Sequence, residues 1–258
     1  MKTWQKIITI SLTVLFTSTS FLIQQAAGND AVDLNLAKRS IISGPQKTIL
    51  IELYTSQGCS SCPPAEQYLN SLKDHSELWK TYIPIALHVD YWDYIGWKDQ
   101  FALPENPSRQ RQYAKVNKQR TIYTPGFFVN GKPWRRSFYD RTPSVEKQRA
   151  GTLRIDLEGK NLSASFSPAT AIKETLVLNV AITGMGYKSD INAGEREGSQ
   201  PSHDFILLAR SQHESEELNW YVPLPRVNHR GATKLAIVAW VSKVDDPSPI
   251  QAAGGYLN

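Results

Sequence analysis

The sequence predicts an α/β domain followed by a smaller all-β, sandwich-like domain. In the first half of the chain, apolar runs alternate with helical segments, which is typical of strand–helix–strand units in a parallel sheet. In the second half, apolar residues occupy every other position, which is the pattern of half-buried antiparallel strands. The 258 residues, 41% of them hydrophobic and 21% charged, exclude collagen-like and wholly disordered chains.

The first segment has the composition of a secretory signal peptide, which we predict over residues 1–27. A short basic stretch precedes an apolar run with interspersed Ser and Thr, and the segment ends at Ala26 and Ala27. This hydroxyl content disfavours the alternative, a retained membrane anchor. We therefore expect a periplasmic or secreted protein, with no membrane attachment after signal removal, in a compartment where thiols oxidise. Residues 28–47 are polar and are expected to form a loose N-terminal arm.

The α/β domain is predicted over residues 48–150. An apolar run at 49–54 predicts a buried strand, which a Gly-Cys-Ser-Ser-Cys-Pro-Pro segment ends. Because proline is tolerated in the first turn of a helix, a helix is expected over 63–74. The dense apolar run at 82–89 predicts a parallel strand that is covered on both faces.

The remaining elements follow in order. In the α/β domain they are an aromatic loop at 91–97, a polar helix at 107–120, a short strand at 127–129 that returns through an Asn-Gly hairpin turn, and a helix from about 143 to 150. In the β-rich domain, residues 151–258, strands are expected at 153–157, 162–166, 176–182, 205–209, 219–223 and 234–244. Clusters of Gly, Pro, Asn and Ser separate them, which favours a small β-sandwich.

Both cysteines of the chain, Cys59 and Cys62, lie in one Cys-x-x-Cys unit between the first strand and its helix. At a helix start, N–H groups and the helix dipole favour a thiolate, and the second sulfur lies within disulfide reach. Two alternatives stay open: an inert structural disulfide, and a metal site with ligands from His75, His88 or carboxylates. We favour a redox-active pair with no metal and no cofactor, because the pair itself can carry the electrons.

The order of elements, with Thr-Pro before the hairpin, resembles the thioredoxin fold. This resemblance implies that Pro125 is a cis-proline that faces the dithiol, and that the backbone of Thr124 pairs with an extended substrate segment. It also implies a buried carboxylate in the strand before the dithiol, for which Glu52 is the candidate. The dipeptide between the cysteines differs from that of ordinary thioredoxins, so the resemblance does not fix the direction of electron flow.

Three motifs resemble more closely a bacterial secreted thioredoxin-like family, catalogued as domain of unknown function 1223. They lie at residues 52–65, at 88–98, and at 123–125 with 129–131. The resemblance runs from about residue 48 to the end of the chain. It implies a thioredoxin-like domain with an appended β-domain, and it implies no substrate.

Two tryptophans of the aromatic loop, Trp92 and Trp97, are candidate substrate-binding residues. They lie near the dithiol end of the predicted sheet, where they could form a platform for an extended peptide. The alternative is that these rings fill the core of a long insertion.

The sequence thus favours a secreted or periplasmic thiol–disulfide oxidoreductase. In this hypothesis Cys59 attacks, Cys62 resolves, Pro125 shapes the substrate groove and Glu52 relays a proton. The expected partners are protein or peptide thiols and disulfides, with a redox partner that the sequence does not identify. The formal net charge of +5 is too small to indicate nucleic-acid binding. The alternatives are a non-catalytic binding or adaptor protein with a structural disulfide, and an extracytoplasmic metal-handling protein.

Overall fold

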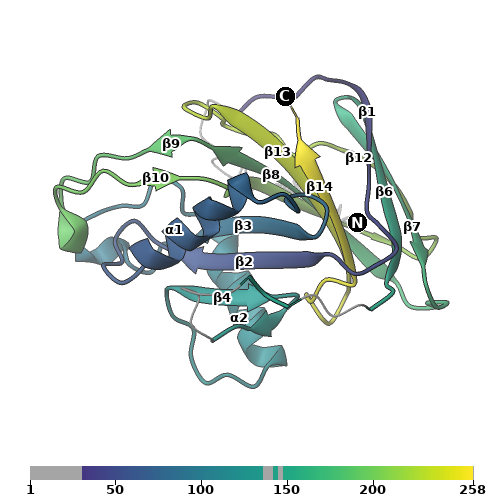
Figure 1. Ribbon diagram of the computed structural model, residues 1–258, viewed down its shortest axis with the longest axis horizontal. Coiled ribbons are helices and arrows are strands. Elements are labelled where there is room, and N and C mark those ends of the chain that lie inside the picture. Colours follow the sequence, from purple (N-terminus) through teal and green to yellow (C-terminus); the bar gives the residue numbers. More distant parts are fainter. Residues whose placement is uncertain (1–30, 136–141, 145–147, 258) are drawn as a thin grey trace, which may run out of the picture.

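The computed structural model describes residues 31–135, 142–144 and 148–257 (Figure 1). Its strands are β1 (Leu36–Ile42), β2 (Ile49–Thr55), β3 (Tyr82–His88), β4 (Gly126–Val129), β5 (Lys132–Pro133), β6 (Gly151–Gly159), β7 (Asn161–Pro168), β8 (Leu176–Met185), β9 (Tyr187–Lys188), β10 (Ser202–His203), β11 (Ile206–Ser215), β12 (Asn219–Pro223), β13 (Lys234–Lys243) and β14 (Gln251–Tyr256). Its helices are α1 (Pro63–Ser71) and α2 (Glu105–Val116), with single 3-10 turns at η1 (Leu72–Asp74), η2 (Asp93–Ile95) and η3 (Gly194–Arg196). None of the helices in this described part is long and apolar enough to span a membrane.

Two large sheets form the framework. The larger sheet is mixed and has eight strands in the order β14-β13-β8-β11-β3-β2-β4-β5, and the smaller is antiparallel with four strands in the order β1-β6-β7-β12. In the larger sheet β2 runs parallel to β3, and β3 pairs in parallel with β11 where Ala86 lies opposite Ile206. A two-stranded ribbon of β9 and β10 extends beyond this sheet (Figure 1).

This architecture overturns the predicted fold class. The molecule is mostly β, so an α/β thioredoxin-like domain followed by a smaller all-β, sandwich-like domain is wrong. The β11–β3 pair joins strands from both sides of residue 150 into one sheet. Alternating apolar residues predict that a segment is a strand, but they do not specify its neighbours in a sheet. The fold class was wrong because the strands pair differently from the expected arrangement.

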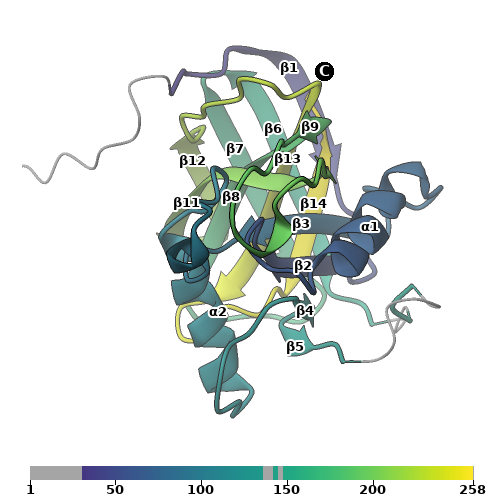
Figure 2. The same cartoon turned by 90° about the vertical axis from the view of Figure 1, so that its left-hand side faces the viewer.

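The two helices cover opposite faces of the β2–β3 region (Figure 2). Successive side chains of a strand point to opposite faces of its sheet. Ile51 and Leu53 accordingly pack into the core beneath α1, whereas Leu50 and Tyr54 pack into the core beneath α2. A third core fills the space between the smaller sheet and strands β8, β13 and β14 of the larger one.

Most predicted elements are confirmed, with shifts at their ends. The N-terminal arm, the last predicted helix and the C-terminal segment differ from the expectation. The predicted loose arm contains β1, which pairs with β6. The described end of the predicted last helix, residues 148–150, is not helical. Strand β14 closes one edge of the larger sheet, where no strand was expected. The predicted signal peptide, residues 1–27, lies outside the described residues.

Candidate functional site

The two cysteines form a disulfide immediately before α1. Strand β2 ends at Thr55, a turn follows, and the helix begins at Pro63 with Cys62 as its N-cap residue. The backbone N–H of Cys62 donates to the carbonyl of Cys59, and the two Cα atoms lie 5.5 Å apart. Prolines at the first helical positions favour a helix start here, because they lack the N–H groups that would have no helical partner. The sequence therefore located the Cys-x-x-Cys unit at the right junction.

The disulfide is covered. Cys59 is 1% exposed and Cys62 is 0% exposed. Residues 91–97, which we call the aromatic segment, lie against the turn that precedes the disulfide. A Cβ atom placed on Gly58 would be 3.4 Å from both Trp92 Cβ and Ile95 Cδ1. An incoming thiol can therefore reach Cys59 only if the side chains or backbone around it move.

The predicted substrate-binding residues bond to one another or to the turn. Trp92 Nε1 donates to Thr124 Oγ1 over 2.6 Å, and Trp97 Nε1 donates to Gln57 Oε1 over 3.0 Å. The Thr124–Pro125 peptide bond is cis, as the resemblance implied. Trp92 is thus joined to Thr124, and Trp97 to the turn before the disulfide, so these side-chain polar groups are engaged in internal hydrogen bonds.

Gln57, two residues before Cys59, is a centre of hydrogen bonds that the sequence analysis missed. Its backbone N–H donates to Asp99 Oδ2 over 2.7 Å, and its Nε2 donates to Ser189 Oγ over 2.6 Å. With the bond from Trp97, this buried side chain connects the turn to the aromatic segment and to the loop that leads to β10. In the sequence, only the position of Gln57 near the first cysteine indicated that it could belong to the site.

A buried histidine pair extends this network. His88 Nδ1 lies 2.7 Å from Asp99 Oδ2. Burial lowers the pKa of His88, but the charge of Asp99 and its hydrogen bond outweigh that effect and raise the pKa overall. His203, whose ring centroid is 5.5 Å from that of His88, has its pKa lowered to about 3 by burial and then by the charge of His88. His88 thus pairs with a carboxylate, whereas His203 stays neutral.

Glu52 lies on the α2 side of the larger sheet, whereas α1 packs on the other side. Its carboxylate accepts hydrogen bonds from Arg109 Nε over 2.7 Å and from the Tyr113 hydroxyl over 2.5 Å. All three side chains are buried. The candidate proton relay is therefore engaged in an internal ion pair, on the sheet face opposite the helix that carries Cys62.

Glu66 is the buried acid on the disulfide side. It lies one helical turn after Cys62, where its Oε1 accepts from Thr55 Oγ1 over 2.7 Å, and it pairs with Arg196 at 3.3 Å. Arg196 Nη1 also reaches the carbonyl of Ser56 at 3.5 Å. An acid in the first turn after Cys-x-x-Cys is visible in the sequence, but nothing there indicates that Arg196 pairs with it.

A groove of about 790 Å³ runs beside this ion pair, between α1 and residues 195–202. Ser60, Pro63 and Glu66 line it on the helix side. It begins at the exposed dipeptide between the cysteines, so it offers a surface next to the disulfide without reaching the sulfur atoms.

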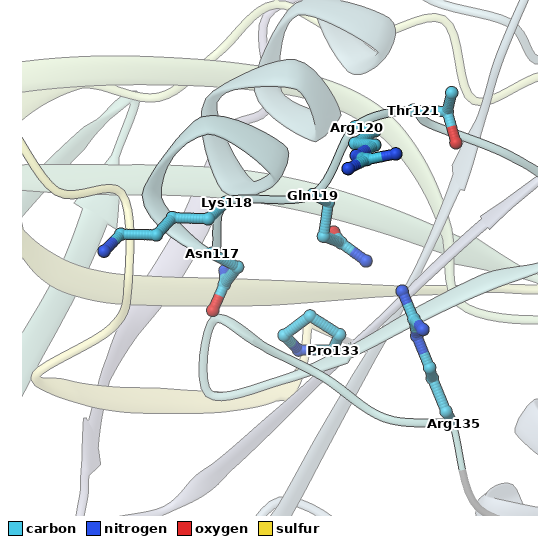
Figure 3. A pocket seen from close by; sticks show the side chains of 7 residues that line it. All are labelled: Asn117, Lys118, Gln119, Arg120, Thr121, Pro133 and Arg135. Atoms are coloured by element: carbon cyan, nitrogen blue, oxygen red, sulfur yellow. The ribbon is translucent and has the colours of Figure 1, made fainter.

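A separate pocket of about 570 Å³ lies at the C-terminal end of α2 (Figure 3). In the figure the Arg135 guanidinium and the Gln119 amide extend into the same space, while Lys118 extends away. The pocket contains none of the predicted site residues, and we assign no chemistry to it.

The two histidines considered as metal ligands have other partners. His88 pairs with Asp99, and His75 Nδ1 accepts from the backbone N–H of Glu77. The described ranges contain no group of three or more His, Cys, Asp and Glu side chains that could hold a metal ion.

Comparisons with known proteins identify a family and a fold. The family model described as protein of unknown function (DUF1223) matches residues 50–242. A crystal structure of a protein from Agrobacterium tumefaciens aligns with 23% identity and a TM-score of 0.62, over 84% of this chain and 97% of that chain. HBP35 of Porphyromonas gingivalis aligns with 12% identity and a TM-score of 0.53, over 83% of this chain and 76% of that chain. At these identities the structural likeness concerns the fold. No curated protein matches the chain.

Proposed function

This chain belongs to the family of proteins of unknown function DUF1223, and we propose that within it the Cys59–Cys62 pair exchanges with thiols and disulfides of protein or peptide substrates. The observation that best supports this proposal is the position of the disulfide at the N-cap of α1. A ring closed over so few residues removes little chain entropy, so stabilisation alone is a weak reason for it. A helix N-terminus stabilises thiolates, which favours exchange.

The exchange proceeds in two steps. A substrate thiolate attacks Cys59 Sγ, the bond between the cysteine sulfurs breaks, and Cys62 leaves as a thiolate at the helix N-cap. The second thiol of the substrate, after losing its proton to water, then attacks the substrate sulfur of the mixed disulfide and releases Cys59. The substrate loses two electrons, which the cysteine pair gains, and the reverse sequence reduces a substrate disulfide.

In this proposal the aromatic segment controls access to Cys59. Replacing Trp92 with Ala removes the indole ring and its hydrogen bond to Thr124, but keeps the Cβ atom that lies beside Gly58. We expect native Trp92→Ala protein to be reduced by dithiothreitol at least tenfold faster than wild type, as followed by alkylation and mass. Tyr94→Ala is the control, because Tyr94 belongs to the same segment but is 80% exposed. Equal rates in all three proteins would oppose this role.

A second candidate is a binding or adaptor protein with a static disulfide, and the burial of both cysteines favours it. Structural disulfides have reduction potentials below about −300 mV, so the potential separates the two candidates.

We also propose that the protein works in the periplasm or outside the cell. The signal-like composition of residues 1–27 supports this, and so does the presence of a disulfide, which persists in oxidising compartments. The mass of the native protein tests the proposal, since removal of the signal leaves a chain that begins near Gly28.

A further inference from the structure

A large groove follows the first half of β11, far along the chain from the cysteines. Its volume is about 1060 Å³, and it lies between residues 100–105, which lead into α2, and residues 225–231. Phe101, Leu103 and Leu207 are among its apolar lining residues. Apolar lining with a few polar groups and a volume of this order are typical of small-molecule sites.

The groove contains a cation that forms no ion pair with a carboxylate of the described residues. Arg210 lines the groove and is partly buried. Its Nη1 donates to Asn179 Oδ1 over 3.3 Å, an oxygen that also accepts from Gln212 Nε2. Within the described ranges, no carboxylate lies within ion-pairing distance of Arg210. Burial lowers the pKa of Arg210, and the neighbouring charge of Arg109 lowers it further.

The charged groups around Arg210 leave this cation uncompensated. Glu52, the fully buried carboxylate of the neighbouring core, is already paired with Arg109 at 2.7 Å. Glu105 lines the groove, and its charge favours the protonated form of Arg210, but it forms no ion pair with it. Arg226, another lining residue, is paired with Asp33 at 3.2 Å. Arg230 also lines the groove but is exposed, so Arg210 is the lining cation that combines partial burial with the absence of an ion pair among the described residues.

The geometry of β11 argues against an added peptide strand in the groove. Beyond Ile206, the edge of β11 that faces β3 has no ladder partner. However, the register of β11 with β8 shifts between Leu207 and Ala209, which interrupts the regular spacing of this strand. Irregular spacing of this kind obstructs strand addition, so a small molecule fits the groove better.

We propose that this groove binds a small amphipathic carboxylate, with its apolar chain on the apolar lining and its carboxylate paired with Arg210. A guanidinium matches a carboxylate in shape and charge, and the pairing is stronger where water is partly excluded. The site is independent of the disulfide and of the proposed exchange reaction.

Isothermal titration of the whole protein with decanoate tests the proposal. We expect saturable binding of one molecule per chain. Acetate, which lacks the chain, and decyltrimethylammonium, which carries the opposite charge, should each bind at least tenfold more weakly. Absence of decanoate binding, or equal binding of decyltrimethylammonium, would overturn the proposal. So would binding of an extended peptide in place of decanoate.

Three variants locate the binding site. Arg210→Gln should weaken decanoate binding by about tenfold or more, which is the usual effect of losing a charged hydrogen-bond partner. Glu105→Gln removes a repulsive charge and should strengthen binding, and it decides the question even if Arg210→Gln fails to fold. Arg226→Gln, which alters a lining arginine that already has a partner, should leave affinity within about twofold of wild type. Unchanged affinity in both Arg210→Gln and Glu105→Gln would contradict the assignment.

Discussion

Glu52 illustrates how the contacts of one side chain decide its role. In the sequence it is an acid within an apolar strand, which suggested a proton relay to the dithiol. In the structure it is fully buried on the α2 side and bonded to Arg109 and Tyr113. A buried carboxylate is tolerated when a cation and further hydrogen-bond donors satisfy it, so its surroundings account for this acid without catalysis.

Glu52→Gln should therefore affect stability more than exchange. Removing one partner of a buried ion pair leaves the other charge uncompensated, which typically costs about 3–5 kcal/mol of unfolding free energy. Urea unfolding measures that loss. In the folded protein, the rate of disulfide reduction should stay within about twofold of wild type. A large fall in this rate at unchanged stability would restore the relay role.

His203 gives the molecule a defined sensitivity to acid. Its pKa is lowered to about 3 in the folded state, against 6.5 for an ordinary histidine. The unfolded chain therefore binds a proton at His203 more readily than the folded protein does. The unfolding free energy that is fully present above about pH 6.5 is lost as the pH falls toward 3. At pH 4 this loss is about 3 kcal/mol, by linkage.

His203→Gln should remove most of this sensitivity, because glutamine does not titrate. Between pH 7 and pH 4, the unfolding free energy of the variant should fall by about 3 kcal/mol less than that of wild type. His88 and Asp99 remain in the variant. The lowered pKa of Asp99 also makes stability fall in acid, as the pH drops through its folded value. The variant thus isolates the contribution of His203, and identical pH profiles would refute it.

At the scale of elements, the disulfide turn is enclosed by segments that are distant in sequence. Gln57 bonds to the aromatic segment through Trp97 and to the loop after β9 through Ser189, while Arg196 approaches the carbonyl of Ser56. The sequence predicted the turn and the aromatic segment, because both have distinctive compositions. It also placed the tryptophans near the dithiol end of the sheet, but it could not predict the hydrogen bond from Trp97 to Gln57, because that bond joins residues far apart in the sequence.

Alanine substitutions at two glycines with left-handed backbone compare the effect of backbone strain alone with that of strain plus steric crowding. Gly131 in the β4–β5 turn has φ +79°, and an added Cβ would lie 2.2 Å from Ser248 Oγ. Gly198 has φ +78° and no heavy atom within 4 Å of such a Cβ. Gly198→Ala should lower the unfolding free energy by about 1 kcal/mol, because of backbone strain alone. Gly131→Ala should cost about 2–3 kcal/mol, because strain and overpacking combine. Urea unfolding compares them, and equal losses would contradict this account.

Strand prediction succeeded where residue patterns are strong. Alternating Leu153, Ile155 and Leu157 correctly indicated β6, and all three are buried. Strand β14 has the sequence Gln-Ala-Ala-Gly-Gly-Tyr, which is poor in β-branched residues and carries little strand signal. It forms because it pairs with β13 along its whole length.

At the scale of the whole molecule, the larger sheet explains why the fold class could not be predicted. The parallel contact between Ile206 and Ala86 makes strands from the second half of the chain neighbours of β3. No local pattern specifies such a partner, because pairing depends on the packing of the assembled sheet. The Cys-x-x-Cys junction and the family were recognisable nevertheless, since both rest on short contiguous motifs.

The proposed exchange of electrons between the Cys59–Cys62 disulfide and thiols can be measured as a redox equilibrium. Equilibrating the native protein with glutathione buffers of known potential, then trapping free cysteines by alkylation, tests it most directly. If the pair is redox-active, it should be a mixture of oxidised and reduced forms at potentials above about −300 mV. A pair that stays fully oxidised at lower potentials, in wild type and in Trp92→Ala alike, would be a structural bridge and would rule out the proposed exchange.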